Sequence, residues 1–213
     1  MGRPVSESFV RAHTRPVRPP LVPEVTLLVA ADVVALWEAM EEHRGAPAED
    51  PPFWAAAWPG GQALARYVLD VPESVAGRAV LDLGAGSGLV AVAAGLAGAG
   101  KVTASEIDPF GKTAIGLNAR LNDVSRIRVV GDVLDGPPPA AGVVLAGDVC
   151  YDRAMTQRVL PFLVSARARG CEVLVGDPGR PYRPTDRLVS LRTYEVPDGD
   201  GGAARSTTVW RLP

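Results

Sequence analysis

Hydrophobic residues occur along this chain in short continuous runs that alternate with stretches of helical periodicity. An apolar run predicts a β-strand at residues 79–83, and the pattern that follows predicts further strands at residues 101–105, 127–130, 143–146 and 173–175. Helices are predicted between these strands at residues 89–97, 109–122 and 153–169. Strands that alternate with helices in this way indicate a mostly parallel sheet with helices on both faces.

The end of the chain departs from this alternation. Residues 191–196 and 207–212 alternate apolar and polar side chains around a loop at 197–202 that contains Pro and Gly. This pattern predicts a C-terminal antiparallel hairpin that closes the parallel sheet. An additional helix is predicted before the sheet at residues 63–69.

The first part of the chain is less regular. Residues 1–20 contain four prolines and little apolar periodicity, so they are expected to form either an arm or a partly disordered segment. A short strand is predicted at residues 25–29 and an amphipathic helix at residues 31–44. The sequence therefore predicts a helical extension in front of the main domain.

Length and composition limit the class of protein. A chain of 213 residues is long enough for one domain with a sizeable core. Its 22 basic and 24 acidic residues give a net charge of −2, so the bulk charge gives no sign of a nucleic-acid or acidic-membrane partner. Cys150 and Cys171 are isolated, with neither C-x-x-C spacing nor a His cluster, and no signal-peptide pattern begins the chain. We therefore expect a cytoplasmic monomer without a metal.

A glycine-rich loop follows the strand at residues 79–83. Gly84, Gly86 and Gly88 allow positive φ angles and leave backbone open to a ligand at the start of the next helix. A dinucleotide fingerprint would need a glycine where Leu89 stands, and no Gly-Lys-Ser/Thr follows as in a P-loop. The pattern D-x-G-x-G-x-G instead looks like the first motif of class I S-adenosylmethionine (SAM) methyltransferases. The alternative is a glycine-rich turn without function.

Acidic residues follow the next two strands. Glu106, 18 residues after Gly88, could accept hydrogen bonds from both ribose hydroxyls of an adenosine. Asp108 competes for that role, but Asp-Pro favours a helix N-cap. Asp132 could accept a hydrogen bond from an adenine amino group, with a plain turn residue as the alternative. The predicted cofactor-binding residues are Trp58, Asp82, Gly84, Ala85, Gly86, Ser87, Gly88, Glu106, Ile107, Asp132, Val133 and Ala146.

Candidate residues for the methyl acceptor lie elsewhere. Asp148 and Tyr151 form a D-x-x-Y pair after the fourth strand. A carboxylate there can orient an amine, stabilise positive charge on it and help an ammonium lose its proton. The alternative is a helix-capping Asp148 with Tyr151 in the core. Trp54 and Trp58 could form walls around a sulfonium or a lysine stem, or could simply close a core. The predicted catalytic residues are Asp148 and Tyr151, and the predicted substrate-binding residues are Phe53, Trp54, Asp148 and Tyr151.

Several segments together resemble the bacterial relatives of the electron transfer flavoprotein β-subunit lysine methyltransferase. They are Val22-Pro23-Glu24, Leu36-Trp37 and the segments 51–67 (PPFWAAAWPGGQALARY), 106–110 (EIDPF), 146–152 (AGDVCYD) and 176–180 (GDPGR). The resemblance implies a seven-strand protein lysine methyltransferase in which Glu106 binds the ribose and Asp148 and Tyr151 line the lysine channel. It also implies a substrate such as the flavoprotein β-subunit or a ribosomal stalk protein.

The residues and the resemblance together predict a Rossmann-like α/β class I methyltransferase fold. Residues 1–50 are expected to form an arm and helix that act as a lid on the substrate side, and residues 51–213 the methyltransferase domain. The expected reaction is methyl transfer from SAM to a protein lysine, with S-adenosylhomocysteine as product and no nucleic acid, membrane or metal involved. A small-molecule N- or O-methyltransferase and a SAM-binding module without catalysis are the alternatives.

Overall fold

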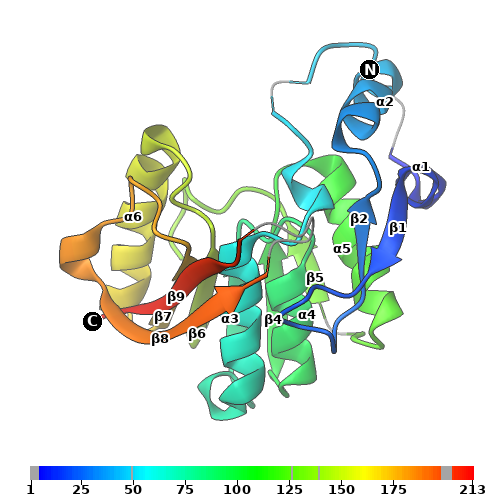
Figure 1. The fold of residues 1–213 in the computed structure, drawn as a ribbon. Coiled ribbons are helices and arrows are strands. Elements are labelled where there is room, and N and C mark those ends of the chain that lie inside the picture. Colours follow the sequence, from blue (N-terminus) through cyan, green and yellow to red (C-terminus); the bar gives the residue numbers. More distant parts are fainter. Residues whose placement is uncertain (1–4, 49, 126, 139, 198–202) are drawn as a thin grey trace.

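The computed structural model describes residues 5–48, 50–125, 127–138, 140–197 and 203–213. Its centre is a seven-stranded sheet in the order β5-β4-β3-β6-β7-β9-β8 (Figure 1). The strands are β3 (Ala79–Leu83), β4 (Lys101–Ser105), β5 (Ile127–Val130), β6 (Val143–Gly147), β7 (Glu172–Asp177), β8 (Val189–Val196) and β9 (Arg205–Leu212). The strands from β5 to β7 are parallel, whereas β9 runs antiparallel to both β7 and β8. The predicted fold, including the C-terminal hairpin, is confirmed. Residues 198–202 of the hairpin loop lie outside the described residues.

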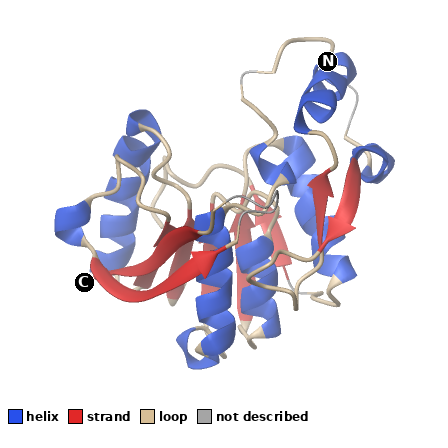
Figure 2. Ribbon diagram, viewed as in Figure 1, coloured by secondary structure: helices blue, strands red, loops and turns tan. Residues whose placement is uncertain are grey.

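Helices cover both faces of the sheet (Figure 2). They are α3 (Pro59–Asp70), α4 (Leu89–Leu96), α5 (Pro109–Leu121) and α6 (Arg153–Ala168). Val80 and Leu145 point into a core shared with α3 and α4, whereas Leu81 and Ala146 point into a second core with α6. Successive residues of a strand face opposite sides of the sheet, so a strand buried on both faces must be apolar throughout. This explains the continuous apolar runs in the sequence.

The predicted element bounds agree with the structure to within two residues except at α3. This helix begins at Pro59, four residues before the predicted start at residue 63. Pro59, Gly60 and Gly61 are typical of a loop, but proline is well suited to the first helical position, where its fixed φ matches the helix. The predicted helix was therefore correct in kind but began four residues too late.

The N-terminal part folds against α5, at the far side of the molecule from α6 (Figure 1). It contains α1 (Glu7–His13), β1 (Thr14–Val17), β2 (Leu27–Ala30) and α2 (Val33–Arg44), and β1 pairs with β2 in a small antiparallel sheet. Val10 is fully buried. The expectation of a partly disordered segment was therefore wrong for residues 5–20, while residues 1–4 and 49 lie outside the described residues. Pro16 had suggested an irregular arm, yet proline is tolerated in a short edge strand.

Asn118 of α5 and Asn122, the C-cap of this helix, attach the N-terminal part to the sheet domain. Asn118 accepts a hydrogen bond from the Leu28 N–H at 2.8 Å, and Asn122 accepts one from the Thr26 N–H at 2.8 Å. Asn118 is completely buried and donates through Nδ2 to the Ser87 carbonyl in the glycine loop.

Among the residues described, we find no helix that is both long and apolar enough to cross a membrane.

Candidate active site

A cavity of about 580 Å³ opens at the carboxyl ends of β3, β4, β6 and β7. Ligands of open α/β sheets bind at this edge, and the volume lies within the usual range of small-molecule sites. The cavity is lined by Arg44, Pro47, Asp50, Pro51, Phe53, Trp54, Trp58, Gly84, Gly86, Glu106, Ile107, Asp108, Pro109, Gly147, Asp148, Val149, Tyr151, Met155 and Arg180.

The glycine loop presents backbone to this cavity. Gly84, Gly86 and Gly88 have φ angles of 65°, 53° and 79°, which side chains other than glycine rarely adopt. Gly84 and Gly86 line the cavity. A Cβ at Gly88 would lie 3.1 Å from the Ile115 side chain, so this glycine permits close packing of the loop on α5. Of the loop residues between them, Ser87 is buried and Ala85 packs on the core.

Asp82 lies beneath the loop. Its carboxylate is 1% exposed and accepts a hydrogen bond from the Ala91 N–H of α4 at 2.9 Å. Burial raises the pKa of Asp82 to about 7, because the charged form loses its hydration. The residue therefore joins β3 to α4 and supports the loop from behind.

Replacing Asp82 with asparagine should make the protein's stability less dependent on pH. The pKa of Asp82 is about 7 in the folded protein, whereas an unperturbed Asp has a pKa of 3.8. Between these two pH values the folded protein keeps a proton on Asp82 that the unfolded chain has lost. Stability should therefore fall as the pH rises from about 4 to about 7. Asparagine keeps an acceptor for Ala91 without this cost, and we expect Asp82→Asn to stabilise by about 3 kcal/mol at pH 8.

Urea unfolding of the SAM-free protein at about pH 5 and about pH 8 measures this effect. Asp135→Asn is the control, because the Asp135 side chain is 87% exposed. Equal pH dependence in the wild type and Asp82→Asn would contradict the prediction.

Glu106 lines the cavity directly beside the glycine loop. Its carboxylate accepts hydrogen bonds from the N–H groups of Gly86 and Asp108, both at 2.8 Å. Burial raises the pKa of Glu106, and these backbone bonds oppose the rise. A carboxylate has about four lone-pair positions, so it can still accept hydroxyl groups of a ligand. Asp108 accepts the Phe110 N–H as the N-cap of α5, which confirms the prediction of a cap.

The other predicted cofactor residues are placed differently. Asp132 accepts hydrogen bonds from the Leu134 N–H and from Arg158, both at 2.9 Å, and these contacts lower its pKa. Within the part of the chain that the structure describes, Asp132, Val133 and Ala146 are not among the lining residues. Ile107 does line the cavity and is 64% exposed. A contact between Asp132 and adenine remains a prediction.

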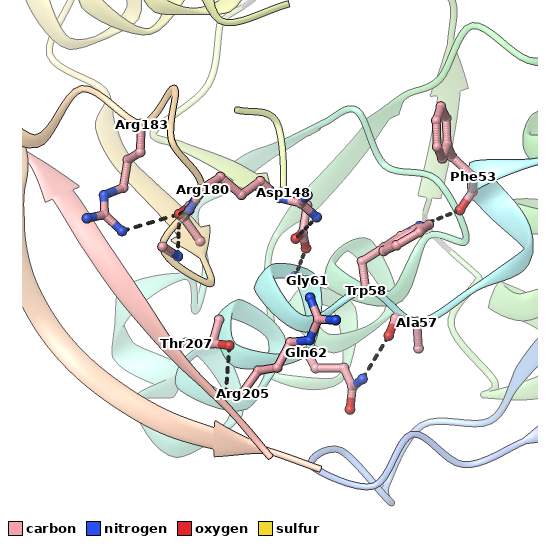
Figure 3. A network of polar contacts seen from close by, with 12 residues as sticks. Phe53, Ala57, Trp58, Gly61, Gln62, Asp148, Arg180, Arg183, Arg205 and Thr207 are labelled. Atoms are coloured by element: carbon pink, nitrogen blue, oxygen red, sulfur yellow. Dashed lines mark hydrogen bonds and ion pairs between the residues drawn. The ribbon is translucent and has the colours of Figure 1, made fainter. Parts of the chain in front are cut away.

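Asp148 lines the same cavity and follows directly after β6. One carboxylate oxygen accepts the Gly61 N–H at 2.8 Å, and the other pairs with Arg180 at 2.8 Å (Figure 3). Burial raises the pKa of Asp148, and Arg180 is the strongest influence in the opposite direction. The residue has a φ of 58°, a left-handed conformation that asparagine and aspartate tolerate best. Asp148 is thus held firmly, with its carboxylate on the cavity wall.

Close backbone packing brings the start of α3 against the ends of β6 and β7. It depends on three glycines, Gly60, Gly147 and Gly176. A Cβ at Gly60 would overlap the Gly176 carbonyl oxygen and lie 2.6 Å from Asp148 Oδ2. A Cβ at Gly147 would lie 2.9 Å from the Gly61 Cα. This close backbone contact is what allows the Gly61 N–H to reach Asp148.

Aromatic rings surround the opening of the cavity. Phe53, Trp58 and Tyr151 are each 40–43% exposed, and the Phe53 ring lies 6.0 Å from Trp58 and 5.7 Å from Tyr151. Trp58 donates its indole N–H to the Phe53 carbonyl at 2.7 Å (Figure 3). Trp54 also lines the cavity but is 2% exposed and packs in the core, as the alternative of closing a core predicts, and a role as a wall around a ligand remains a prediction.

Sequence reasoning missed two basic residues of the cavity wall, as well as Asp50. Arg180 and Arg44 line the cavity, and Arg44 also lies over the Phe110 ring and pairs with Asp108 at 3.4 Å. Arg180 stood in a segment noted only for its resemblance, and nothing in its spacing connects it with Asp148. Over the described ranges, no cluster of His, Cys, Asp and Glu could hold a metal ion.

Comparison with known proteins identifies the family. The family model of ribosomal protein L11 methyltransferase (PrmA) matches residues 63–147. The electron transfer flavoprotein beta subunit lysine methyltransferase of Xenopus laevis is 39% identical over 212 residues, covering 95% of this chain and 85% of that protein. The corresponding protein of Danio rerio is 37% identical over 200 residues, covering 90% of this chain and 76% of that protein. The chain belongs to the electron transfer flavoprotein beta subunit lysine methyltransferase family.

Solved methyltransferases share the fold of this member of the lysine methyltransferase family. Magnesium protoporphyrin IX methyltransferase (ChlM) from Synechocystis PCC 6803, solved with bound SAM, has a TM-score of 0.53 at 16% identity and covers 71% of this chain and 80% of its own. TrmN from Thermus thermophilus has a TM-score of 0.53 at 18% identity and covers 84% of this chain and 66% of its own. The predictions of the family, of a SAM-dependent methyltransferase and of SAM as cofactor are confirmed.

Proposed function

We propose that this enzyme transfers a methyl group from SAM to the side-chain amine of a lysine in a protein, and that the electron transfer flavoprotein beta subunit is the substrate to test first. One observation carries the proposal: a single cavity joins the glycine loop, the Asp148 carboxylate and a ring of aromatic side chains. The names of the relatives support lysine as the acceptor.

The residues at the loop end of the cavity fit the cofactor. Gly84 and Gly86 bring backbone to the cavity surface, and the nearby Glu106 carboxylate can accept hydroxyl groups. When bound, SAM supplies an electrophilic methyl group on a sulfonium and leaves as S-adenosylhomocysteine. The cavity also has room for a second group, because its volume of about 580 Å³ extends from this loop to Asp148 and the aromatic opening.

The residues at the opposite end fit an amine. Asp148 can accept a hydrogen bond from the lysine nitrogen and stabilise the positive charge that develops on it. Tyr151, Phe53 and Trp58 can pack on the hydrocarbon stem of the lysine, because such stems bury readily while the charged head stays hydrated. A compact metabolite would not contact these three exposed aromatic side chains. The small-molecule alternative is therefore not favoured.

The N-terminal part would lie on the substrate side. Arg44 at the end of α2 lines the cavity, as do Pro47 and Asp50 after it, which supports the division into a lid of residues 1–50 and a methyltransferase domain of residues 51–213. We further propose a cytoplasmic monomer that acts on protein, without nucleic acid or membrane. The near-neutral net charge of −2 supports this, because nucleic acids and acidic membranes attract strongly basic proteins.

The direct test incubates the purified enzyme with methyl-labelled SAM and purified flavoprotein beta subunit. Mass spectrometry should then locate methyl groups on one or a few lysines of the subunit. Ribosomal protein L11 is the comparison substrate, because the family model that matches residues 63–147 is named for it. Labelling of small molecules alone, or of neither protein, would overturn the proposal.

Replacing Glu106 with alanine should weaken SAM binding. The change removes a charged acceptor for the ribose and leaves the N–H groups of Gly86 and Asp108 without their partner. We expect a loss of about 1–3 kcal/mol in binding free energy, measured by isothermal titration calorimetry. Asp108→Asn is the matched control, because asparagine is an equally good N-cap for α5. Unchanged affinity in Glu106→Ala would remove Glu106 from the cofactor site.

A further inference from the structure

Arg180 makes the closest charged contact to Asp148. Its Nη2 lies 2.8 Å from Asp148 Oδ1, and its guanidinium forms part of the cavity wall. The two side chains are 24% and 10% exposed, so water screens the pair much less than a surface ion pair. A positive charge therefore stands beside the carboxylate that faces the methyl acceptor.

The loop after β7 is built to hold Arg180 in this position. The buried Asp177 carboxylate accepts the N–H groups of Gly179 and Arg180 at 2.7 and 2.8 Å and pairs with Arg183 at 3.2 Å. Arg183 in turn stacks on the Trp210 ring at 4.4 Å. Gly179 has a φ of 90°, so the turn needs a glycine. The contact with Asp148 thus depends on a well-anchored segment rather than on a freely moving side chain.

The charge of Arg180 matters because Asp148 alone would favour the protonated form of a neighbouring lysine. A buried carboxylate next to an amine stabilises the ammonium form, and an ammonium has no lone pair with which to attack a methyl group. A guanidinium on the same carboxylate compensates its negative charge. A lysine beside the neutral pair is therefore easier to deprotonate than a lysine beside a lone carboxylate.

We propose that Arg180 is a positioning residue that fixes and neutralises Asp148, so that the target lysine enters the cavity as a hydrogen-bonded amine and not as a trapped ammonium. The proton that the lysine gives up passes to water at the open mouth of the cavity. The inference rests on the proposed function, because it concerns the protonation of a lysine substrate.

Most of the other charged groups around Asp148 are acidic, so the positive charge of Arg180 has a large influence there. Asp177 of β7 adds negative charge near Asp148. Glu106, Asp108 and Asp50 also line the cavity, whereas Arg44 is the other basic residue among the lining residues. The phenol of Tyr151 faces the same space, and the Gly61 N–H of α3 is the uncharged partner of Asp148. Without Arg180, this environment would be strongly acidic and would hold a lysine in its charged form.

The test measures kcat against pH for Arg180→Gln with the flavoprotein beta subunit and SAM both saturating, from about pH 6.5 to about pH 10. We expect the rising part of the profile to move by about one pH unit or more to the alkaline side. At pH 7 the rate should then fall about tenfold or more while KM for the protein does not rise. At the alkaline end the rate should return towards that of the wild type.

Two variants of the same loop separate charge from structure. Arg180→Lys keeps a positive charge and should retain most of the wild-type profile. Arg183→Gln removes an arginine that binds Asp177 and Trp210, so it reports on loop anchoring. The inference is overturned if Arg180→Gln keeps the wild-type profile, if Arg183→Gln shifts it equally, or if a folded Arg180→Gln stays inactive at the alkaline end. A wild type that methylates no lysine would instead refute the proposed function.

Discussion

Replacing Asp148 with asparagine should lower the rate of lysine methylation about 10²–10³-fold, the usual effect of losing one electrostatic contact to a developing charge. Asparagine fits the same space and tolerates the left-handed backbone at φ 58°, so the fold should persist. Its NH₂ group, however, must face either the Gly61 N–H or Arg180, and both of these are donors. The variant therefore loses the carboxylate and disturbs the two contacts that hold it.

SAM affinity should change little in Asp148→Asn, because Gly84, Gly86 and Glu106, the lining residues proposed to hold the cofactor, are unchanged. Calorimetry of SAM binding, together with single-turnover methylation, separates the two effects. Asp152→Asn is the matched control: Asp152 caps α6 through the Met155 N–H, and asparagine caps equally well. If Asp148→Asn keeps more than about a tenth of the wild-type rate, Asp148 makes no electrostatic contribution of the expected size.

Replacing Gly60 with alanine should destabilise the protein by about 3 kcal/mol, because the new methyl group would overlap the backbone carbonyl of Gly176. Backbone cannot rotate away as a flexible side chain can, so α3 would have to move from the ends of β6 and β7. For a domain of this size the melting temperature should fall by about 6–12 °C. Methylation should fall as well, since Asp148 Oδ2 lies only 2.6 Å from the added atom.

Gly61→Ala provides a control at the next position of the same helix. A Cβ there meets only the Val90 side chain at 4.0 Å, an ordinary contact. Alanine is also preferred over glycine within a helix, so this variant should be neutral or more stable by about 0.5–1 kcal/mol. Equal losses in both variants would mean that the close approach of Gly60 to Gly176 is not what limits stability.

The middle of the central sheet could be predicted from the sequence because strands such as β3 and β6 are buried on both faces. Residues 79–83 form a strand with the predicted bounds, since a local apolar run ended by glycine carries that information. The cofactor end of the cavity was predictable for a related reason. Gly84, Gly86 and Glu106 follow successive strands, and parallel strands bring their carboxyl ends together.

Contacts between distant segments could not be predicted in this way. Arg180 reaches Asp148 across 32 positions, and Gly61 reaches it across 87 positions. No sequence periodicity links such residues, because the contact depends on how closely two distant backbone segments approach each other. The predicted helix at residues 63–69 left out Gly60, whereas the structure has this glycine in α3, where it permits the packing of the helix against two strands. Tertiary packing alone gives this glycine its role.

Asn118 connects the N-terminal sheet with the glycine loop. Its buried side chain accepts a hydrogen bond from the Leu28 amide and donates one to the Ser87 carbonyl. Separation of β2 from α5 would break the first bond and expose the Asn118 amide to water, which weakens its hold on the loop. In hydrogen exchange, the Leu28 amide should report on the loop more than 50 residues away, because local unfolding proceeds in cooperative units.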